Sequence, residues 1–159
     1  MKLLRVGKLG SEIVATLDSN NVIRDLSDHI KDLNPQTINE DTLNKLKSIK
    51  LSELKEIKSN IRIGACISNP VDFLAIGLNY KAHAVGTKSK LPTEPIVFNK
   101  SSGCIQGPND QIIKPWSASK MDYEVEVGMI IGREGKYIKE ENAQDYIFGY
   151  CIVNDISER

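Results

Sequence analysis

Apolar and polar positions give the first part of the chain a pattern of short strands around one helix. Apolar runs that are broken by turn-forming residues predict β-strands. These runs cover residues 3–6, 13–17 and 22–23. Residues 39–49 predict a helix, because apolar residues recur there at three-residue spacing and Glu40 and Asp41 stand at its start. Residues 1–70 are therefore predicted to form a small N-terminal α+β domain.

The pattern changes at Pro70, after which apolar runs predict a strand-rich region over residues 71–159. The predicted strands cover residues 73–77, 96–98, 112–113, 123–131 and 148–154. The sequence Gly-Pro-Asn-Asp at residues 107–110 predicts a turn, and residues 140–146 predict one short helix. The fold class predicted for the whole chain is therefore α+β.

Alternation over residues 122–128 predicts a strand with carboxylates on one face and apolar side chains on the other. The carboxylates belong to Asp122, Glu124 and Glu126. Neighbouring carboxylates repel one another, and a hard divalent cation, which prefers oxygen ligands, would relieve that repulsion. An ordinary amphipathic strand with a solvated acidic face is the alternative, and the spacing alone favours this alternative.

Two further residues are candidates for chemistry. Asp155 follows an apolar strand, where it would either supply a third carboxylate ligand or cap the next turn, and position alone favours the cap. His83 follows the predicted strand at 73–77 and is a candidate general base, although a single histidine is more often structural. The other histidine, His29, lies among polar residues and is predicted to be on the surface.

Composition excludes several classes of function. Lys and Arg number 21, as do Asp and Glu, so no basic excess points to nucleic acid. No apolar stretch approaches the roughly 20 residues that span a bilayer, and the start does not resemble a signal peptide, so a cytoplasmic protein is expected. The three cysteines, Cys66, Cys104 and Cys151, are far apart in the sequence and predict reduced thiols with no disulfide framework.

An ordered set of segments resembles the fumarylacetoacetate hydrolase family. The set comprises residues 76–84 (IGLNYKAHA), 94–100 (EPIVFNK), 107–110 (GPND), 122–128 (DYEVEVG) and 149–159 (GYCIVNDISER). Residues 1–5 and 23–27 resemble one branch of it, which contains 2,4-diketo-3-deoxy-L-fuconate hydrolases and proteins labelled ureidoglycolate lyase. The resemblance covers essentially the whole chain.

This resemblance implies a mixed β-roll over residues 71–159, homodimers, and a Mg²⁺ ion, or Mn²⁺ or Ca²⁺, that binds a small 2-oxo acid. The implied activity is that of a hydrolase or lyase that cleaves a carbon–carbon bond in an acylpyruvate-type substrate, with the ion stabilising the enolate. The implied site residues are Glu124, Glu126 and Asp155 as metal ligands, His83 as the catalytic base, and Lys100 and Tyr80 as substrate contacts.

Two departures from the family pattern leave alternatives open. Many members carry a Glu three residues after the catalytic His, where this chain has Gly86, and a His without that carboxylate is a weaker base. A decarboxylase or isomerase is therefore an alternative to the hydrolase. Family members also continue well beyond the match to residues 157–159. The C-terminal part of the β-roll is expected to be absent from this chain, and a catalytically inactive metal-binding subunit is the second alternative.

Overall fold

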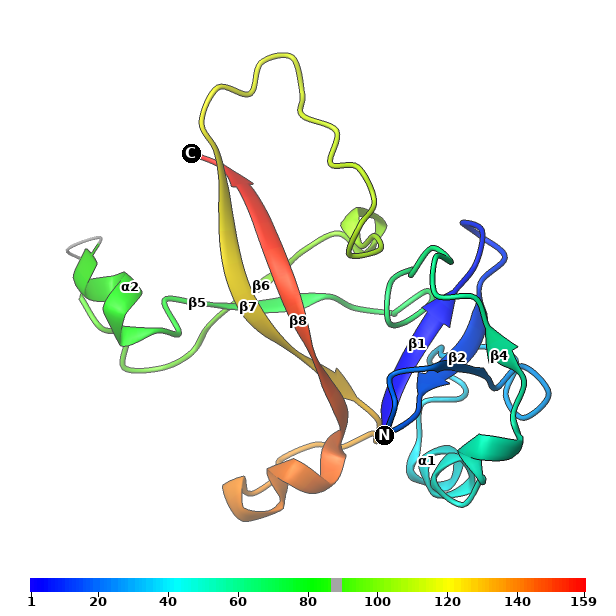
Figure 1. The fold of residues 1–159 in the computed structure, drawn as a ribbon. Helices are drawn as coiled ribbons and strands as arrows, with labels where there is room; N and C mark the ends of the chain where they lie inside the picture. The colour runs from blue at the N-terminus through cyan, green and yellow to red at the C-terminus, as the bar shows by residue number, and fades with distance from the viewer. Residues whose placement is uncertain (87–89) are drawn as a thin grey trace. The chain divides into compact units, whose positions relative to one another are not determined.

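The computed structural model describes residues 1–86 and 90–159, which form two compact units (Figure 1). One unit contains Met1–Ser68 together with Gln106–Arg159, and the other contains Asn69–Ile105. The predicted domain boundary at residue 70 stays a prediction. Within the described residues, no helix has the length and apolar character needed to cross a membrane.

The first unit begins with a four-stranded antiparallel sheet in the order β1-β2-β3-β4. The strands are β1 (Lys2–Val6), β2 (Ile13–Leu17), β3 (Ile23–Asp25) and β4 (Glu56–Ile57). The three strands predicted from apolar runs are confirmed. The prediction missed β4, because two residues are too few to produce a pattern.

Asp18 shapes the turn between β2 and β3. Its Oδ1 accepts hydrogen bonds from the backbone N–H groups of Asn20 and Val22, at 2.8 and 3.0 Å. Asn21 takes a left-handed backbone conformation with φ of 60°, which Asn tolerates better than most residues. The polar run between the two strands therefore forms a turn closed by a side chain.

Helix α1 (Glu40–Lys47) begins at Asn39, whose side chain accepts a hydrogen bond from the backbone N–H of Thr42 at 2.9 Å. Two acidic residues lie in the first turn and two lysines in the last, as the helix dipole favours. Leu46 is fully buried and faces the core. The predicted helix is thus confirmed.

Apolar residues cover both faces of the sheet. One cluster of buried residues joins β2 to α1 and consists of Val14, Leu26, Ile30, Leu33, Ile38 and Leu46. The other contains Val6, Ala15 and Ile23. Ile130 and Phe148, which come from the last two strands of the chain, pack against the first cluster. The core of this unit therefore joins segments from both ends of the sequence.

Strands β7 (Met121–Ile131) and β8 (Ile147–Glu158) form a long twisted antiparallel ribbon, gold and red in Figure 1. The register shifts at a bulge between Ile130 and Ile131. Residues Glu140–Tyr146 between the strands form a 3₁₀-helix, so the predicted short helix is present in a tighter form. Both strands were predicted, and β8 extends beyond its predicted end at residue 154.

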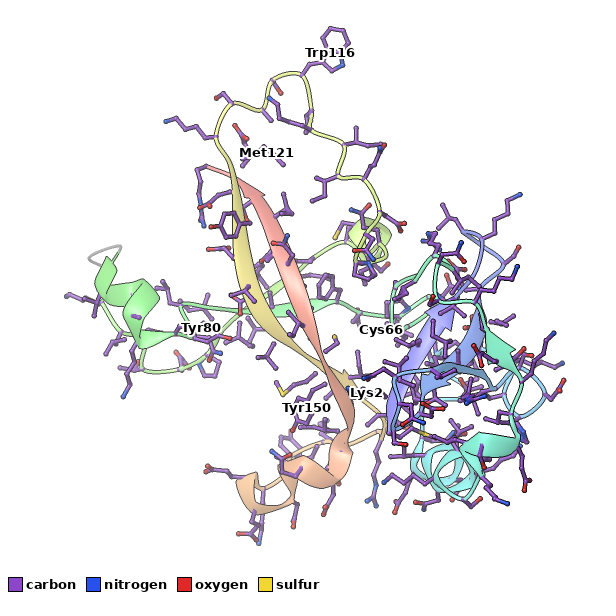
Figure 2. All side chains as sticks on the ribbon, in the orientation of Figure 1. Lys2, Cys66, Tyr80, Trp116, Met121 and Tyr150 are labelled. Carbon is purple, nitrogen blue, oxygen red and sulfur yellow. The ribbon has the colours of Figure 1, made fainter. Side chains whose placement is uncertain are left out.

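The predicted strand at Ile112 and Ile113 is wrong. These residues lie in an irregular loop and are 50% and 89% exposed. The run contains only two apolar residues and is followed closely by Pro115, which has no N–H for a strand ladder. Trp116 projects from the same loop and is fully exposed (Figure 2).

The second unit is a hairpin with a helix between its strands. Strands β5 (Leu74–Gly77) and β6 (Ile96–Asn99) pair antiparallel, and α2 (Lys81–Gly86) follows β5. Leu78 takes a left-handed conformation with φ of 50°, which is unfavourable for a residue with a bulky side chain. This backbone turn ends β5. A 3₁₀-helix at Ser102–Cys104 lies near the end of the unit.

Ion pairs join the predicted turn at residues 107–110 to the N-terminal sheet. The Arg62 guanidinium donates two hydrogen bonds to the Asp110 carboxylate, at 2.7 and 2.6 Å, and one to Glu12 at 2.7 Å. The Asp110 carboxylate also accepts a hydrogen bond from the backbone N–H of Gly107 at 2.8 Å. The predicted turn is confirmed, and the paired geometry with Arg62 holds it in place.

We predict that Asp110→Asn lowers the denaturant midpoint at neutral pH but not in acid. Hydrogen bonds from Arg62 hold the pKa of the Asp110 carboxyl below its ordinary value. Such a group stabilises the fold above its unfolded pKa of about 3.9, and this contribution disappears as pH falls through the folded pKa. Urea unfolding from pH 7 to about pH 3 would measure the difference. Exposed Asp28→Asn is the control, and a difference that persists undiminished at the acid end would contradict the prediction.

Candidate functional site

Strand pairing places the three candidate carboxylates on one face of the ribbon. Glu124 lies directly opposite Asp155 in the register, and Glu126 lies opposite Val153. Residues that face each other across an antiparallel pair project to the same side, as do residues two apart on one strand. The backbone therefore groups Glu124, Glu126 and Asp155 on one side of two adjacent strands.

The opposite face of the ribbon is apolar and exposed. Tyr123, Val125 and Val127 are 77%, 74% and 61% exposed. Glu124 and Glu126 are only partly exposed, and the Glu124 side chain retains 21% of its accessible surface. An ordinary amphipathic strand would show the reverse arrangement. Asp122, on the same face, is 47% exposed. The acidic face is therefore solvated at Asp122 and half-buried at Glu124 and Glu126.

Arg159 binds the acidic face at the end of β8. Its Nε donates to Asp122 Oδ2 at 3.1 Å, and its Nη2 donates to Glu124 Oε1 at 2.5 Å. These hydrogen bonds raise the pKa of Arg159, the one to Glu124 most. Sequence reasoning did not identify this residue. The sequence did show a positively charged residue at the end of the segment that matches the family pattern. Its pairing with Asp122 and Glu124, however, depends on the strand register, which the sequence alone does not show.

The donor chemistry of this face fits a hard divalent cation, because all three groups offer carboxylate oxygens held by strand backbones. In the part of the chain that the structure describes, no three acidic, His or Cys side chains converge into a metal-binding group. The Glu124 carboxylate points to Arg159 instead. Side-chain rotation, with the backbone in place, would be required to bring the three carboxylates to one ion.

Asp155 lies inside β8, which continues to Glu158. It therefore does not cap a turn after the strand, and that alternative is wrong. Glu158, at the end of β8, is the acidic residue that binds backbone groups of a neighbouring loop. Its Oε1 accepts hydrogen bonds from the backbone N–H groups of Ser119 and Lys120, at 2.7 and 3.0 Å. These bonds join the end of β8 to the beginning of β7.

The remaining candidate residues lie in the second unit. Tyr80 precedes α2 and is 42% exposed, and its carbonyl accepts a hydrogen bond from the backbone N–H of Ala84. His83 lies within α2, and its side chain is outside the part that the structure describes. Lys100 follows β6, where its backbone N–H donates to the Phe73 carbonyl at 2.7 Å.

The hairpin register separates two of these residues. Gly77, near Tyr80, pairs with Ile96, whereas Lys100 follows the other end of the hairpin, where Leu74 pairs with Asn99. The Lys100 ammonium lies 5.4 Å from the centre of the Phe98 ring, so it is directed back along its own strand. Within this unit, Tyr80 and Lys100 therefore occupy opposite ends of the hairpin.

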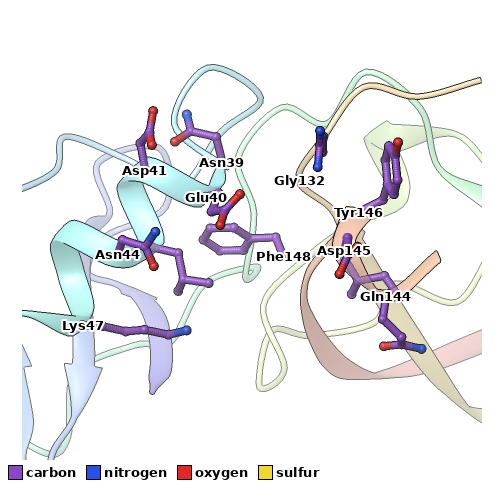
Figure 3. Close-up of a pocket in the computed structure, with 13 residues that line it drawn as sticks. Asn39, Glu40, Asp41, Asn44, Lys47, Gly132, Gln144, Asp145, Tyr146 and Phe148 are labelled. Atoms are coloured by element: carbon purple, nitrogen blue, oxygen red, sulfur yellow. The ribbon is translucent and has the colours of Figure 1, made fainter. Parts of the chain in front are cut away.

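A pocket of about 490 Å³ lies elsewhere in the first unit, between α1 and the connection from β7 to β8 (Figure 3). Its lining includes Lys47, Arg133 and Asp145 together with the ring of Phe148. Glu124 is seven residues along β7 from the end that approaches this pocket, roughly 23 Å at the usual strand rise. None of the three candidate ligands lines it, and we assign it no role.

A protein-family model matches the second part of the chain. Residues 72–159 match the family model described as fumarylacetoacetate (FAA) hydrolase C-terminal. A protein of Burkholderia ambifaria that carries the name "Putative hydrolase" is 45% identical over 100% of this chain, which covers 56% of that protein. The chain therefore spans about half the length of the curated relatives that it matches.

Solved structures show the same fold. The 5-carboxymethyl-2-hydroxymuconate delta-isomerase of Mycobacterium smegmatis is 25% identical, with a TM-score of 0.71 over 99% of this chain and 56% of its own. The maleylpyruvate hydrolase of Sphingobium sp. SYK-6, solved with manganese and pyruvate, is 19% identical, with a TM-score of 0.75 over 100% of this chain and 60% of its own. The predicted fold, part of a fumarylacetoacetate-hydrolase-like domain, is confirmed.

We predict that Gly128→Ala destabilises the ribbon by about 1–3 kcal/mol. A Cβ at this position would lie 2.7 Å from Cys151 Sγ and 2.9 Å from Val153 Cγ2, on the face that carries the candidate carboxylates. Gly149→Ala is the control, because a Cβ there meets nothing within 4 Å. Urea unfolding of both variants measures the effect, and equal stability of the two would contradict the steric argument.

Proposed function

Because this chain belongs to the fumarylacetoacetate hydrolase family, we propose that it carries the divalent-metal site of a hydrolase or lyase. The proposed substrate is a small 2-oxo acid of the acylpyruvate type, in which a carbon–carbon bond is cleaved. The proposed branch is that of the 2,4-diketo-3-deoxy-L-fuconate hydrolases and the proteins labelled ureidoglycolate lyase. We propose a homodimer as the working assembly.

The observation that carries the proposal is the pairing of Glu124 with Asp155 across β7 and β8, with Glu126 on the same partly buried face. Carboxylates held together in this way repel one another unless a cation binds between them. Arg159 supplies positive charge to Glu124 and Asp122 in this structure. A divalent ion would supply more charge at the same face.

The proposed ligands, Glu124, Glu126 and Asp155, suit Mg²⁺ and also Mn²⁺ or Ca²⁺, since all three ions accept oxygen ligands. The manganese and pyruvate in the Sphingobium hydrolase support an ion of this kind and a 2-oxo acid. When bound, such an ion acts as a Lewis acid toward the oxygens of the substrate.

The protein side chains have separate proposed roles. His83 would accept a proton from the attacking water, for which a neutral imidazole near physiological pH is suited. Lys100 would bind the substrate carboxylate through its positive charge, and Tyr80 would donate a hydrogen bond to substrate. Arg159 would release Glu124 on metal binding and remain paired with Asp122.

We predict that the protein binds Mn²⁺ or Mg²⁺ saturably and that Glu124→Gln/Glu126→Gln abolishes this binding. The change removes two anionic ligands while keeping side-chain size. Calorimetric titration of each ion into the folded proteins measures binding. Glu140→Gln/Glu141→Gln, in the exposed 3₁₀-helix before β8, is the charge-matched control. Unaltered binding by the first double variant would exclude these ligands.

Gly86 favours an alternative, a decarboxylase or isomerase of 2-oxo acids, because neither reaction requires a carboxylate to orient a hydrolytic base. The proteins similar in structure include both an isomerase and a hydrolase. Product analysis with oxaloacetate and an acylpyruvate would distinguish decarboxylation from hydrolysis.

Gly86→Glu tests the hydrolase directly. A Cβ at Gly86 meets nothing within 4 Å, so a larger residue can be accommodated at the end of α2. If His83 acts as the base, we expect the new carboxylate to raise kcat for acylpyruvate hydrolysis by roughly 10²-fold, the scale of general-base catalysis. Gly86→Gln is the uncharged control. No gain over that control would favour the isomerase or decarboxylase.

A further inference from the structure

The acidic face of the ribbon contains a positive charge that comes from the chain itself. Asp155 and Ser157 alternate onto this face, and Arg159 continues the alternation just after β8. The guanidinium reaches across to β7, where Nε donates to Asp122 at 3.1 Å and Nη2 donates to Glu124 at 2.5 Å. One planar group therefore binds two carboxylates that lie two residues apart on the neighbouring strand.

Backbone hydrogen bonds fix the position of Arg159 independently of its side chain. The N–H of Arg159 donates to the Lys120 carbonyl at 3.1 Å, which continues the antiparallel pairing beyond the end of β8. The preceding residue, Glu158, binds the backbone N–H groups of Ser119 and Lys120. Strand pairing thus brings the guanidinium to the acidic face, and replacing this side chain would leave the backbone bonds in place.

Arg159 occupies a carboxylate oxygen that the proposed ion would need. Glu124 Oε1 accepts the shorter of the two hydrogen bonds, and the Glu124 side chain retains only 21% of its accessible surface. Charge-assisted hydrogen bonds of this length are among the stronger ones in proteins. A divalent ion bound beside the guanidinium would also be repelled by it. Arg159 and a divalent ion therefore compete for Glu124.

Asp122 provides a second binding position for the same guanidinium. It is not one of the proposed ligands, and its side chain and that of Arg159 are both 47% exposed. The bonds to Asp122 and Glu124 use different nitrogens of the guanidinium, so the bond to Glu124 can break while the other persists. Arg159 can therefore leave the ligand without losing its place on the ribbon.

We propose that Arg159 is an internal competitor of the divalent ion and sets the metal affinity of this face. By binding Glu124, it supplies positive charge to the metal-free carboxylates and closes the face to the ion. Its withdrawal onto Asp122 makes Glu124 available as a ligand. This inference rests on the metal site proposed above, and it adds the residue that controls access to that site.

Calorimetric titration of Mn²⁺ into wild type, Arg159→Gln and Arg133→Gln tests the proposal. Arg133 is an exposed arginine beyond the other end of β7, with its guanidinium over the Tyr146 ring, so its replacement is the charge-matched control. We expect Arg159→Gln to lower the Kd for Mn²⁺ roughly threefold to tenfold, because a partly buried, charge-assisted pair contributes more than an exposed one. Arg133→Gln should leave the Kd unchanged.

The stability of the same variants gives a second measurement. Without the guanidinium, the carboxylates of Asp122 and Glu124 repel each other, so metal-free Arg159→Gln should unfold at a lower urea concentration than wild type. Saturating Mn²⁺ should close this difference, because an ion that binds the variant more tightly stabilises it more. If Arg159 had only a packing role, the difference would be the same with and without Mn²⁺.

A third measurement uses wild type and does not depend on how the variants fold. In an NMR titration with diamagnetic Mg²⁺, the guanidinium signals of Arg159 should shift in step with the binding measured by calorimetry. Unchanged signals at saturation, or Mn²⁺ binding by Arg159→Gln that is no tighter than that of wild type, would overturn the competition and leave the metal site standing. Absence of binding by wild type and by both variants would instead overturn the proposed function, and this inference with it.

Discussion

The antiparallel register of β7 and β8 determines which side chains can meet in the candidate site. It sets Glu124 against Asp155, places Glu126 on the same side, and directs Tyr123, Val125 and Val127 to the other. Each of these positions depends on hydrogen bonds between backbones, so the grouping of charge requires no favourable contact between the carboxylates themselves. The N-terminal core supports the ribbon at its far end, through Ile130 and Phe148.

The local pattern of apolar and polar residues was sufficient to predict many of the strands and the first helix. Strict alternation predicted β7, apolar runs predicted β1 and β2, and the spacing of Leu46 and its neighbours predicted α1. The same signals failed where elements are very short or where irregular chain happens to be apolar. β4 has two residues and no pattern of its own, and Ile112 and Ile113 resemble a strand without having a partner strand.

Contacts between segments that are distant in the sequence could not be predicted from the local pattern of residues. Alternation placed Glu124 and Glu126 on one face, but the position of Asp155 opposite Glu124 follows only from the register of two strands that are separated by a long connection. The partners of Arg159 have the same origin. Family resemblance pointed to the three candidate ligands because it carries information about spatial proximity that spacing along one chain lacks.

The bulge between Ile130 and Ile131 absorbs one residue without disturbing the pairs on either side of it. Elsewhere in the ribbon, inserting or deleting a single residue would turn every following side chain to the opposite face. Substitutions on the apolar face alter one contact at a time, whereas a change of length between Glu124 and the bulge would separate the carboxylates from their partners. The exposed apolar face can therefore change in composition one residue at a time, while the length of the ribbon between these points is constrained.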